Sequence, residues 1–149
     1  MRTLAIVNLK GGTGKTVSAA NMAHILATVH HKKVLLVDGD KQGSVSQYFQ
    51  VYGEHDGTAA LLLADGLDAE AVERAIYRTG YYGLDIITSN LELYAADRAL
   101  YDRQDTDTAR VLSSVLDHVR NDYDFCIIDN GPSVDTVTLN VLAAADDVL

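Results

Sequence analysis

The sequence predicts an α/β fold in which a mostly parallel sheet is covered by helices on both faces. Short apolar runs recur along the chain and are mostly unbroken, as in strands buried on both sides. Segments with the spacing of amphipathic helices lie between them, and this alternation is typical of an α/β fold with right-handed crossovers. At 149 residues and 48% hydrophobic composition, the chain is long enough for one such domain with its own core.

Each expected element corresponds to its own stretch of sequence. The four apolar runs expected as strands are Leu4–Val7, Val34–Val37, Leu84–Thr88 and Phe125–Ile128. Two helices are indicated by apolar residues at i, i+3, i+4 and i+7, namely Ala19, Met22, Ala23 and Leu26, and then Leu112, Val115, Leu116 and Val119. Weaker helical patterns, separated by turn-forming glycines, cover Ala59–Ala64, Ala69–Arg78, Leu91–Leu100 and Thr136–Ala144. Asp68 and Asp105 are the expected helix caps.

The last residues, Asp146–Leu149, resemble the start of a fifth apolar strand. A sheet that stops one or two residues into a strand would leave an unpaired apolar edge, which natural proteins cover or charge. We therefore expect residues 1–149 to form a single but incomplete domain. Either it is the amino-terminal part of a larger protein, or a partner completes its sheet.

Composition narrows the function classes. Twelve Lys and Arg against 21 Asp and Glu give a net charge of −9, which opposes a broad electrostatic grip on nucleic acid by this chain as a whole. One cysteine and no apolar leader predict a reducing, cytoplasmic compartment, and no apolar stretch approaches the length of a membrane segment. The local basic run His30–Lys33 is interpreted as cations at a helix end rather than as a DNA or metal site.

A glycine-rich turn, within LKGGTGKT, follows the first strand and precedes the first helix. Unpaired N–H groups at a helix start converge on one point, where the helix dipole also favours negative charge. Gly11, Gly12 and Gly14 let a ligand approach the backbone without a Cβ in the way. Lys15 would reach the β- and γ-phosphates of a nucleotide, and the Thr16 hydroxyl would bind Mg²⁺. The turn is therefore predicted to be a phosphate-binding loop.

This loop departs from the usual spacing because Leu9 stands where a first glycine is expected, and a second lysine, Lys10, follows it. A side chain at the outer lip of the loop cannot easily fold back onto its own phosphates, but it can reach phosphates held by a second subunit. There it would stabilise the charge of the transferring phosphoryl group, as an arginine finger does in trans. The alternative is a solvated lysine with no such role.

Two strand ends add carboxylates to the same site. Asp38 and Asp129 each end an apolar run, so in a parallel sheet both would emerge at the carboxyl edge, where ligands bind in such folds. There they could hold waters of a Mg²⁺ shell. Asp40, two residues past its strand, is free to approach the γ-phosphate and orient the attacking water. The alternative for Asp40 is that it caps the next helix.

Three segments resemble the ParA/MinD family of ATPases, including its Soj-like members. KGGTGKT, residues 10–16, resembles the family's deviant phosphate loop K-G-G-x-G-K-T; VLLVDGDKQGS, residues 34–44, resembles its D-x-D-P-Q-G-N switch; YDFCIIDNGPSVD, residues 123–135, resembles its h-h-h-D-x-x-P segment. The resemblance implies a three-layer P-loop NTPase fold over residues 1–149, covering only about the first half of a typical member.

By the same resemblance the chain binds ATP and Mg²⁺. The implied nucleotide contacts are Lys10, Gly11, Gly12, Thr13, Gly14, Lys15, Thr16 and Val17. The implied catalytic residues are Lys10, Lys15 and Asp40, and the implied metal residues are Thr16, Asp38 and Asp129. The departures from the family pattern are Val17 for a second threonine, Lys41 for the switch proline, Ser44 for asparagine, and Asn130–Gly131 for Thr-Pro. We expect them to affect rate and switch timing more than ATP binding.

The resemblance also implies a function and its partners. A homodimer would form when ATP binds and hydrolyse ATP slowly, stimulated by a ParB-like protein, in the partition of plasmid or chromosomal DNA. Non-specific DNA would bind through a region outside these residues. Two alternatives stay open: a MinD-like ATPase that docks on membrane and positions the division site, and a nucleotide-gated binding module with little hydrolysis. The lone Cys126 argues against a nitrogenase iron protein, which bridges an iron–sulfur cluster with its cysteines.

Overall fold

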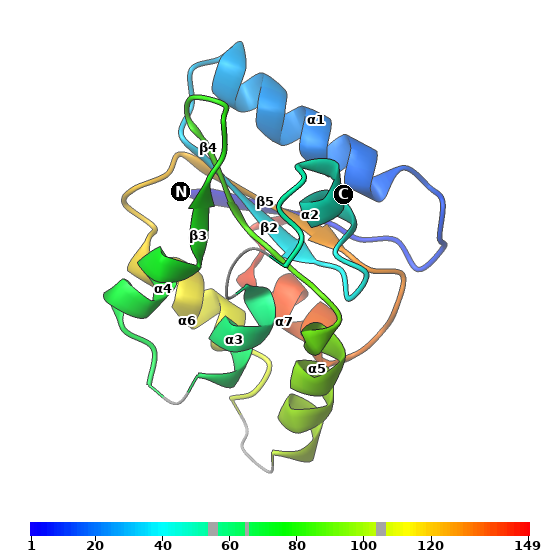
Figure 1. The fold of residues 1–149 in the computed structure, drawn as a ribbon. Helices are drawn as coiled ribbons and strands as arrows, with labels where there is room; N and C mark the ends of the chain where they lie inside the picture. The colour runs from blue at the N-terminus through cyan, green and yellow to red at the C-terminus, as the bar shows by residue number, and fades with distance from the viewer. Residues whose placement is uncertain (54–56, 65, 104–106) are drawn as a thin grey trace.

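The computed structural model describes residues 1–53, 57–64, 66–103 and 107–149, and over these residues it shows one six-stranded sheet between two layers of helices (Figure 1). The strand order is β3-β4-β2-β5-β1-β6, and every pairing is parallel except that of β3 with β4. The strands are β1 (Arg2–Ile6), β2 (Val34–Gly39), β3 (Ile76–Arg78), β4 (Leu84–Ile87), β5 (Phe125–Asn130) and β6 (Asp147–Val148).

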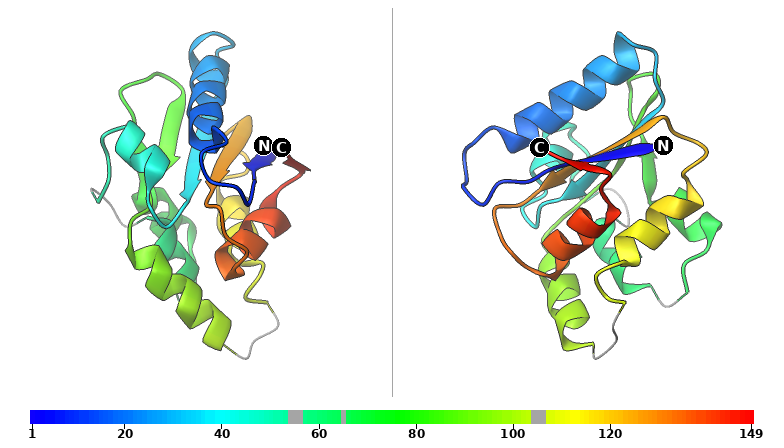
Figure 2. Two further views of the ribbon diagram at one scale, coloured as in Figure 1. Left: turned by 90° about the vertical axis from the view of Figure 1, so that its right-hand side faces the viewer. Right: turned by 180° about the vertical axis from the view of Figure 1, so that it is seen from behind.

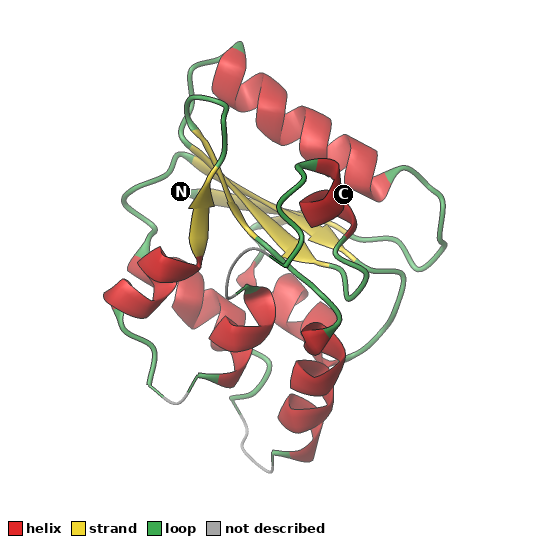
Figure 3. Ribbon diagram, in the orientation of Figure 1, coloured by secondary structure: helices red, strands yellow, loops and turns green. Residues whose placement is uncertain are grey.

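Helices cover both faces of the sheet (Figures 2 and 3). The helices are α1 (Lys15–Thr28), α2 (Ser44–Tyr48), α3 (Thr58–Leu63), α4 (Ala69–Ala75), α5 (Glu92–Asp102), α6 (Val111–His118) and α7 (Thr136–Ala144). Helices α1 and α2 lie on one face, and the remaining helices lie on the other. None of the helices in the described ranges is long and apolar enough to cross a membrane.

The unbroken apolar run of β2 is explained by two separate cores. Successive side chains of a strand point to opposite faces. Leu35 and Val37 pack into the core beneath α3 to α7, while Val34 and Leu36 pack into the core beneath α1 and α2. All four are fully buried. Because both faces are covered, no position in this strand is left for a polar residue until Asp38.

Helix α1 lies close against the sheet because its buried residues are small. Ala19, Ala20, Ala23 and Ala27 are its buried positions, and it contacts β2 and β5. The spacing that predicted this helix through Met22 and Leu26 found the right face, although those two larger side chains are only partly buried at its margin. The α6 pattern is confirmed fully, since Leu112, Val115, Leu116 and Val119 are all buried.

The predicted fold class is confirmed: a mostly parallel sheet with helices on both faces. All four expected strands form, and the expected fifth strand forms as β6 beside β1. Its pairing continues past the strand itself, because Leu149 N donates to the Ala5 carbonyl at 2.9 Å and Val7 N donates to the Leu149 carbonyl at 2.9 Å. The phosphate-loop strand β1 therefore has a neighbour on both sides.

One expected helix is wrong at its end, and one helix was not expected. Helix α4 stops at Ala75, where Ala69–Arg78 had been expected to continue, because Ile76–Arg78 turn into β3 and pair antiparallel with β4. β-branched and aromatic side chains such as those of Ile76 and Tyr77 favour strand. The five-residue helix α2 has no sequence pattern of its own. The Asp68 cap is confirmed by a 2.7 Å hydrogen bond from Ala71 N, and Asp105 lies outside the described residues.

Candidate nucleotide-binding site

The turn between β1 and α1 forms an open cradle at the carboxyl edge of the sheet. Gly12 (φ 72°) and Gly14 (φ 87°) adopt left-handed backbone conformations, which cost a residue with a side chain roughly 1–2 kcal/mol. Helix α1 begins directly after Gly14, and no side chain of the described residues caps its first N–H groups. A Cβ placed on Gly11, Gly12 or Gly14 would meet no described atom within 4 Å. The glycine loop thus borders open space.

A cavity of about 440 Å³ lies over this cradle. Its lining combines the phosphate loop, the start of α1 and the two loops that follow β2 and β5. The lining residues are Gly11, Gly12, Thr13, Gly14, Lys15, Thr16, Val17, Asp40, Gln42, Ser44 and Pro132. The structure therefore brings together seven of the eight predicted nucleotide contacts and the predicted catalytic Asp40. Gln42, Ser44 and Pro132 were not expected as lining residues, although Gln42 and Ser44 lie in the switch segment and Pro132 lies in the h-h-h-D-x-x-P segment.

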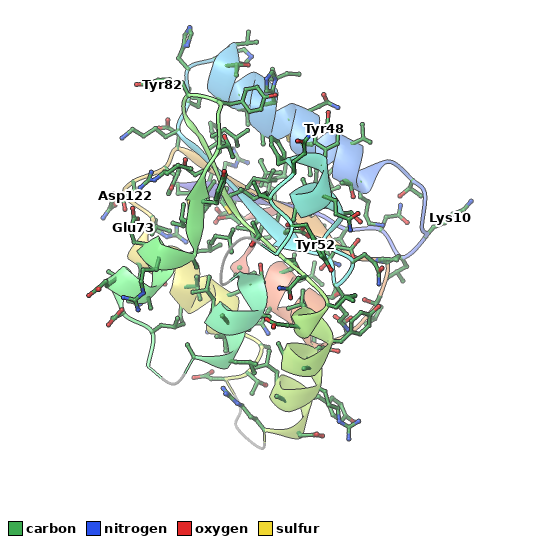
Figure 4. All side chains as sticks on the ribbon, in the orientation of Figure 1. Lys10, Tyr48, Tyr52, Glu73, Tyr82 and Asp122 are labelled. Atoms are coloured by element: carbon green, nitrogen blue, oxygen red, sulfur yellow. The ribbon has the colours of Figure 1, made fainter. Side chains whose placement is uncertain are left out.

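The two lysines of the loop differ in their surroundings. The Lys10 side chain is exposed and extends away from the molecule (Figure 4). Its backbone closes the loop instead, because the Lys10 carbonyl accepts hydrogen bonds from Lys15 Nζ at 3.4 Å and Thr13 Oγ1 at 3.3 Å. The Lys15 ammonium thus rests over its own loop, within the cavity, while that of Lys10 has no partner among the described residues.

Asp129, at the end of β5, is a buried carboxylate without a hydrogen-bond partner. It is fully buried, and neither oxygen accepts a hydrogen bond at normal distance from any described residue. Burial raises the pKa of Asp129 to about 6; the nearby Thr16 hydroxyl and Lys15 ammonium act to lower it, and the charge of Asp40 acts to raise it. An isolated buried charge is unfavourable, so this group suits a site that a cation completes.

Asp38, at the end of β2, is equally buried but fully engaged. Its Oδ2 accepts hydrogen bonds from the Ser46 backbone N at 2.9 Å and the Ser46 hydroxyl at 2.6 Å, and its Oδ1 accepts one from Asp40 N at 3.0 Å. Burial raises the pKa of Asp38 to about 7 against these hydrogen bonds, and the neighbouring charge of Asp129 adds to the rise. Both oxygens therefore hold α2 and the loop between β2 and α2, residues 40–43, which we call the switch loop. Asp38 does not line the phosphate cavity.

Asp40 lines the cavity and also organises its own turn. Its Oδ1 accepts a hydrogen bond from Gln42 N at 2.9 Å, and its Oδ2 accepts one from the Ser44 hydroxyl at 3.2 Å. A Cβ on Gly131 would stand 3.1 Å from Asp40 Oδ1, so the glycine leaves room for this carboxylate. The capping interpretation and the nucleotide interpretation are therefore compatible, because the carboxylate does the first while it borders the cavity.

A second cavity, of about 570 Å³, opens at the opposite, amino edge of the sheet. Glu73, Tyr82 and Asp122 mark its rim (Figure 4). Arg78 within it already pairs with Glu73 and Asp85. The basic run His30–Lys33 follows directly after the end of α1 at Thr28, where His30 N and Lys32 N donate to the Ile25 and Leu26 carbonyls, and its last three residues line this cavity.

Fold and cradle together define a P-loop domain of the three-layer α/β class, with a glycine loop between an inner strand and a helix start. The chain belongs to the AAA domain family AAA_31, which matches residues 1–149, and its resemblance to ParA-type proteins is confirmed.

Individual relatives agree with this assignment. The chromosome-partitioning ATPase Soj of Treponema pallidum is 38% identical over 148 residues, which are 99% of this chain and 55% of that protein. Cobyrinic acid a,c-diamide synthase from Mycobacterium smegmatis, with a bound ATP analog and magnesium, has a TM-score of 0.87 at 33% identity and covers 99% of this chain and 58% of its own. A putative plasmid partition protein from Borrelia burgdorferi, bound to AMPPNP, has a TM-score of 0.80 at 28% identity, with coverages of 99% and 60%. The chain spans about half the length of the curated relatives it matches.

Proposed function

We propose that this chain is the nucleotide-binding part of an ATP-dependent dimerisation switch that hydrolyses ATP slowly and acts in the partition of plasmid or chromosomal DNA. The observation that carries the proposal is the open cradle of unpaired helix amides beside Lys15, with the orphaned Asp129 carboxylate behind it. Its relatives include a chromosome-partitioning ATPase and a putative plasmid partition protein bound to AMPPNP, which supports ATP as the ligand.

The residues present fit a magnesium ion together with the phosphates. The described residues hold no cluster of three or more His, Cys, Asp or Glu side chains able to bind a metal ion alone. Mg²⁺ needs no such cluster, because it is usually held by one or two carboxylates, waters and substrate phosphates. Thr16 and Asp129 would hold it directly or through water, and it would neutralise charge on the phosphates. Asp38 would act on the site through the switch loop.

Each group of the site would then have its own role in binding or hydrolysis. The loop amides and Lys15 would bind the β- and γ-phosphates. Asp40 would orient the attacking water from across the cavity that it lines. Lys10 would reach the nucleotide of a second subunit, and its outward, unpartnered side chain supports this role. A ParB-like protein would stimulate turnover, and DNA would bind outside these residues, consistent with the −9 charge.

A second candidate comes from one structural relative that is, by its name, a diamide synthase. In that case ATP would be consumed only with a carboxylic acid acceptor present. Phosphate release from ATP and Mg²⁺ alone would favour the switch. An amphipathic membrane-binding helix elsewhere in the protein would favour the MinD-like alternative over DNA partition.

The proposal is tested by binding of a fluorescent ATP analogue with Mg²⁺, and by phosphate release, in the protein as its gene encodes it. Lys15→Ala should abolish binding. Lys10→Ala should bind as a monomer with affinity within about twofold of wild type, yet lose dimerisation and, as for a finger residue acting in trans, about 10³-fold or more in turnover. Lys33→Ala, an exposed lysine at the opposite edge, is the matched control.

Each result tests a separate part of the proposed function. A Lys15→Ala protein that binds like wild type rules out the cradle as the ATP site. Normal hydrolysis by Lys10→Ala rules out its role in trans, and binding without turnover in wild type leaves the nucleotide-gated binding module as the function.

A further inference from the structure

We propose that Lys41 is a positioning residue for Asp40: its ammonium, held between Asp97 of α5 and Asp135 before α7, fixes the switch loop in place over the phosphate cradle. The inference rests on the proposed function, in which Asp40 orients the attacking water. Lys41 stands where the ParA pattern has proline, so this chain replaces a rigid residue by a charged anchor.

The Lys41 ammonium is largely buried and forms two short ion pairs. Lys41 Nζ lies 2.8 Å from Asp97 Oδ2 and 2.7 Å from Asp135 Oδ2. The three side chains are only 14%, 19% and 14% exposed. The Tyr94 ring adds a cation–π contact, with its centroid 5.2 Å from the ammonium. Exposed ion pairs contribute little, but a largely dehydrated cation between two carboxylates resists separation because each charge would lose its partner.

Both carboxylates are themselves fixed by the backbone, so the anchor ties the loop to rigid elements. Asp97 Oδ1 accepts a hydrogen bond from Val137 N at 3.2 Å, and Asp135 Oδ1 caps α7 by accepting one from Thr138 N at 2.9 Å. The Ser133 hydroxyl donates to Asp135 Oδ2 at 2.5 Å. Lys41 therefore joins three chain segments: the switch loop, helix α5 and the start of α7.

Asp40 depends on this tie because its own hydrogen bonds stay within the loop. Gln42 N and the Ser44 hydroxyl, which donate to Asp40, move together with it. Asp38 fixes the loop at one end through Asp40 N. On the side facing α5, the loop is held by Lys41 and by the hydrogen bond from Gln42 Nε2 to Tyr94 Oη at 2.9 Å. Without Lys41, the position of the Asp40 carboxylate over the cradle would no longer be fixed from that side.

The test separates turnover from binding. Steady-state ATP hydrolysis and affinity for a fluorescent ATP analogue with Mg²⁺ are measured for wild type, Lys41→Met, Lys41→Arg and a control, Arg74→Met. Arg74 forms an exposed ion pair with Glu70 on α4, away from the cavity. Lys41→Met should lower kcat about tenfold, since small misplacements of a reacting group cost this much or more, with nucleotide affinity within about twofold. Lys41→Arg should recover most of the rate, and Arg74→Met should match wild type.

A second readout follows the loop without ATP. Amide hydrogen exchange in the nucleotide-free protein should be faster over residues 39–44 in Lys41→Met than in wild type, and unchanged over α1. If Lys41→Met does not fold, Asp97→Asn replaces it; because this variant keeps the Asp135 contact, about a threefold loss of kcat is expected.

The outcomes are distinct. Wild-type kcat in Lys41→Met, or unchanged exchange over residues 39–44, overturns the inference and leaves the proposed function intact. A parallel loss of affinity, turnover and thermal stability also overturns it, because Lys41 would then only support the fold. A wild-type protein without ATP turnover overturns the proposed function first, and the inference with it.

Discussion

The phosphate loop and the switch loop follow strands of the same sheet edge and line the same cavity. They differ in whether their charged side chains have partners within the protein. Around the phosphate loop, the Lys10 and Lys15 ammonium groups form no ion pair within the described chain, and Asp129 accepts no hydrogen bond there. In the proposed function, the nucleotide and its metal ion would satisfy these groups.

In the switch loop every charge already has a partner. The Asp38 carboxylate accepts hydrogen bonds from Ser46 N and Asp40 N, and the Asp40 carboxylate accepts one from Gln42 N. The Lys41 ammonium forms ion pairs with Asp97 of α5 and Asp135 before α7. The difference teaches that one loop is completed by what it binds and the other by the protein itself. Changes at Lys15 and at the glycines of the phosphate loop should therefore act on binding, whereas changes in the switch should act on turnover and stability.

The largest effect that would sharpen this contrast is at Asp40. Asp40→Ala should reduce ATP turnover about 10³-fold, within the range for loss of a positioned proton-handling group, while nucleotide affinity stays within about twofold. Steady-state phosphate release and analogue binding measure the two quantities. Asp117→Ala, which removes an exposed carboxylate of α6 that pairs with Arg120, is the control. Equal rates for wild type and Asp40→Ala would leave Asp40 with only its capping role.

Gly12 of the phosphate loop and Gly43 of the switch loop allow the stability of the two loops to be compared by the same substitution. Gly43 (φ 63°) and Gly12 (φ 72°) are both left-handed, but a Cβ on Gly43 would stand 2.6 Å from the Ser89 carbonyl oxygen and 2.5 Å from the Tyr52 ring, whereas Gly12 faces open space. Gly43→Ala should cost about 3 kcal/mol of unfolding free energy and Gly12→Ala about 1 kcal/mol.

Urea denaturation without nucleotide measures both costs, and analogue binding should show the reverse order, with Gly12→Ala weakening ATP binding more than Gly43→Ala. Equal destabilisation by the two substitutions would mean that the switch loop yields as easily as the phosphate loop, which would break the contrast.

The sequence predicted the parts of this molecule that depend on neighbours along the chain. The apolar runs of Val34–Val37 and Phe125–Ile128, the α6 spacing and the phosphate loop are local patterns with a physical period or a fixed order of residues. Each was found where it was expected.

The parts that were missed depend on contacts between distant residues. Lys41 meets partners 56 and 94 positions away, so its sequence context shows only a missing proline. Asp38 ends a strand, as its place in the sequence indicates, but the sequence does not show that Ser46 donates two hydrogen bonds to its carboxylate. Strand β3 forms because it pairs with β4, with Ile76 opposite Ile87. The helical pattern expected over Ala69–Arg78 did not indicate that pairing.

The smallest expected effect concerns pH and follows from the two buried carboxylates. Their pKa values, about 7 for Asp38 and about 6 for Asp129, lie above those of an unfolded chain. The folded state therefore binds protons more tightly, and the stability contributed by these groups is lost as pH rises from about 4 to 7. The lowered pKa values of Asp135 and Asp147 act only below about pH 4.

Without nucleotide, the free energy of unfolding should thus be lower at pH 8 than at pH 5 by about 1 kcal/mol or more, measured by urea denaturation. Asp129→Asn should reduce this difference, because it removes the charge that has no partner, while Asp117→Asn should leave it unchanged. A midpoint that rises from pH 5 to pH 8 would contradict the raised pKa values of both carboxylates. An unchanged pH difference in Asp129→Asn would mean that Asp129 is satisfied within the protein after all, and the cradle would then resemble the switch loop in needing no ligand.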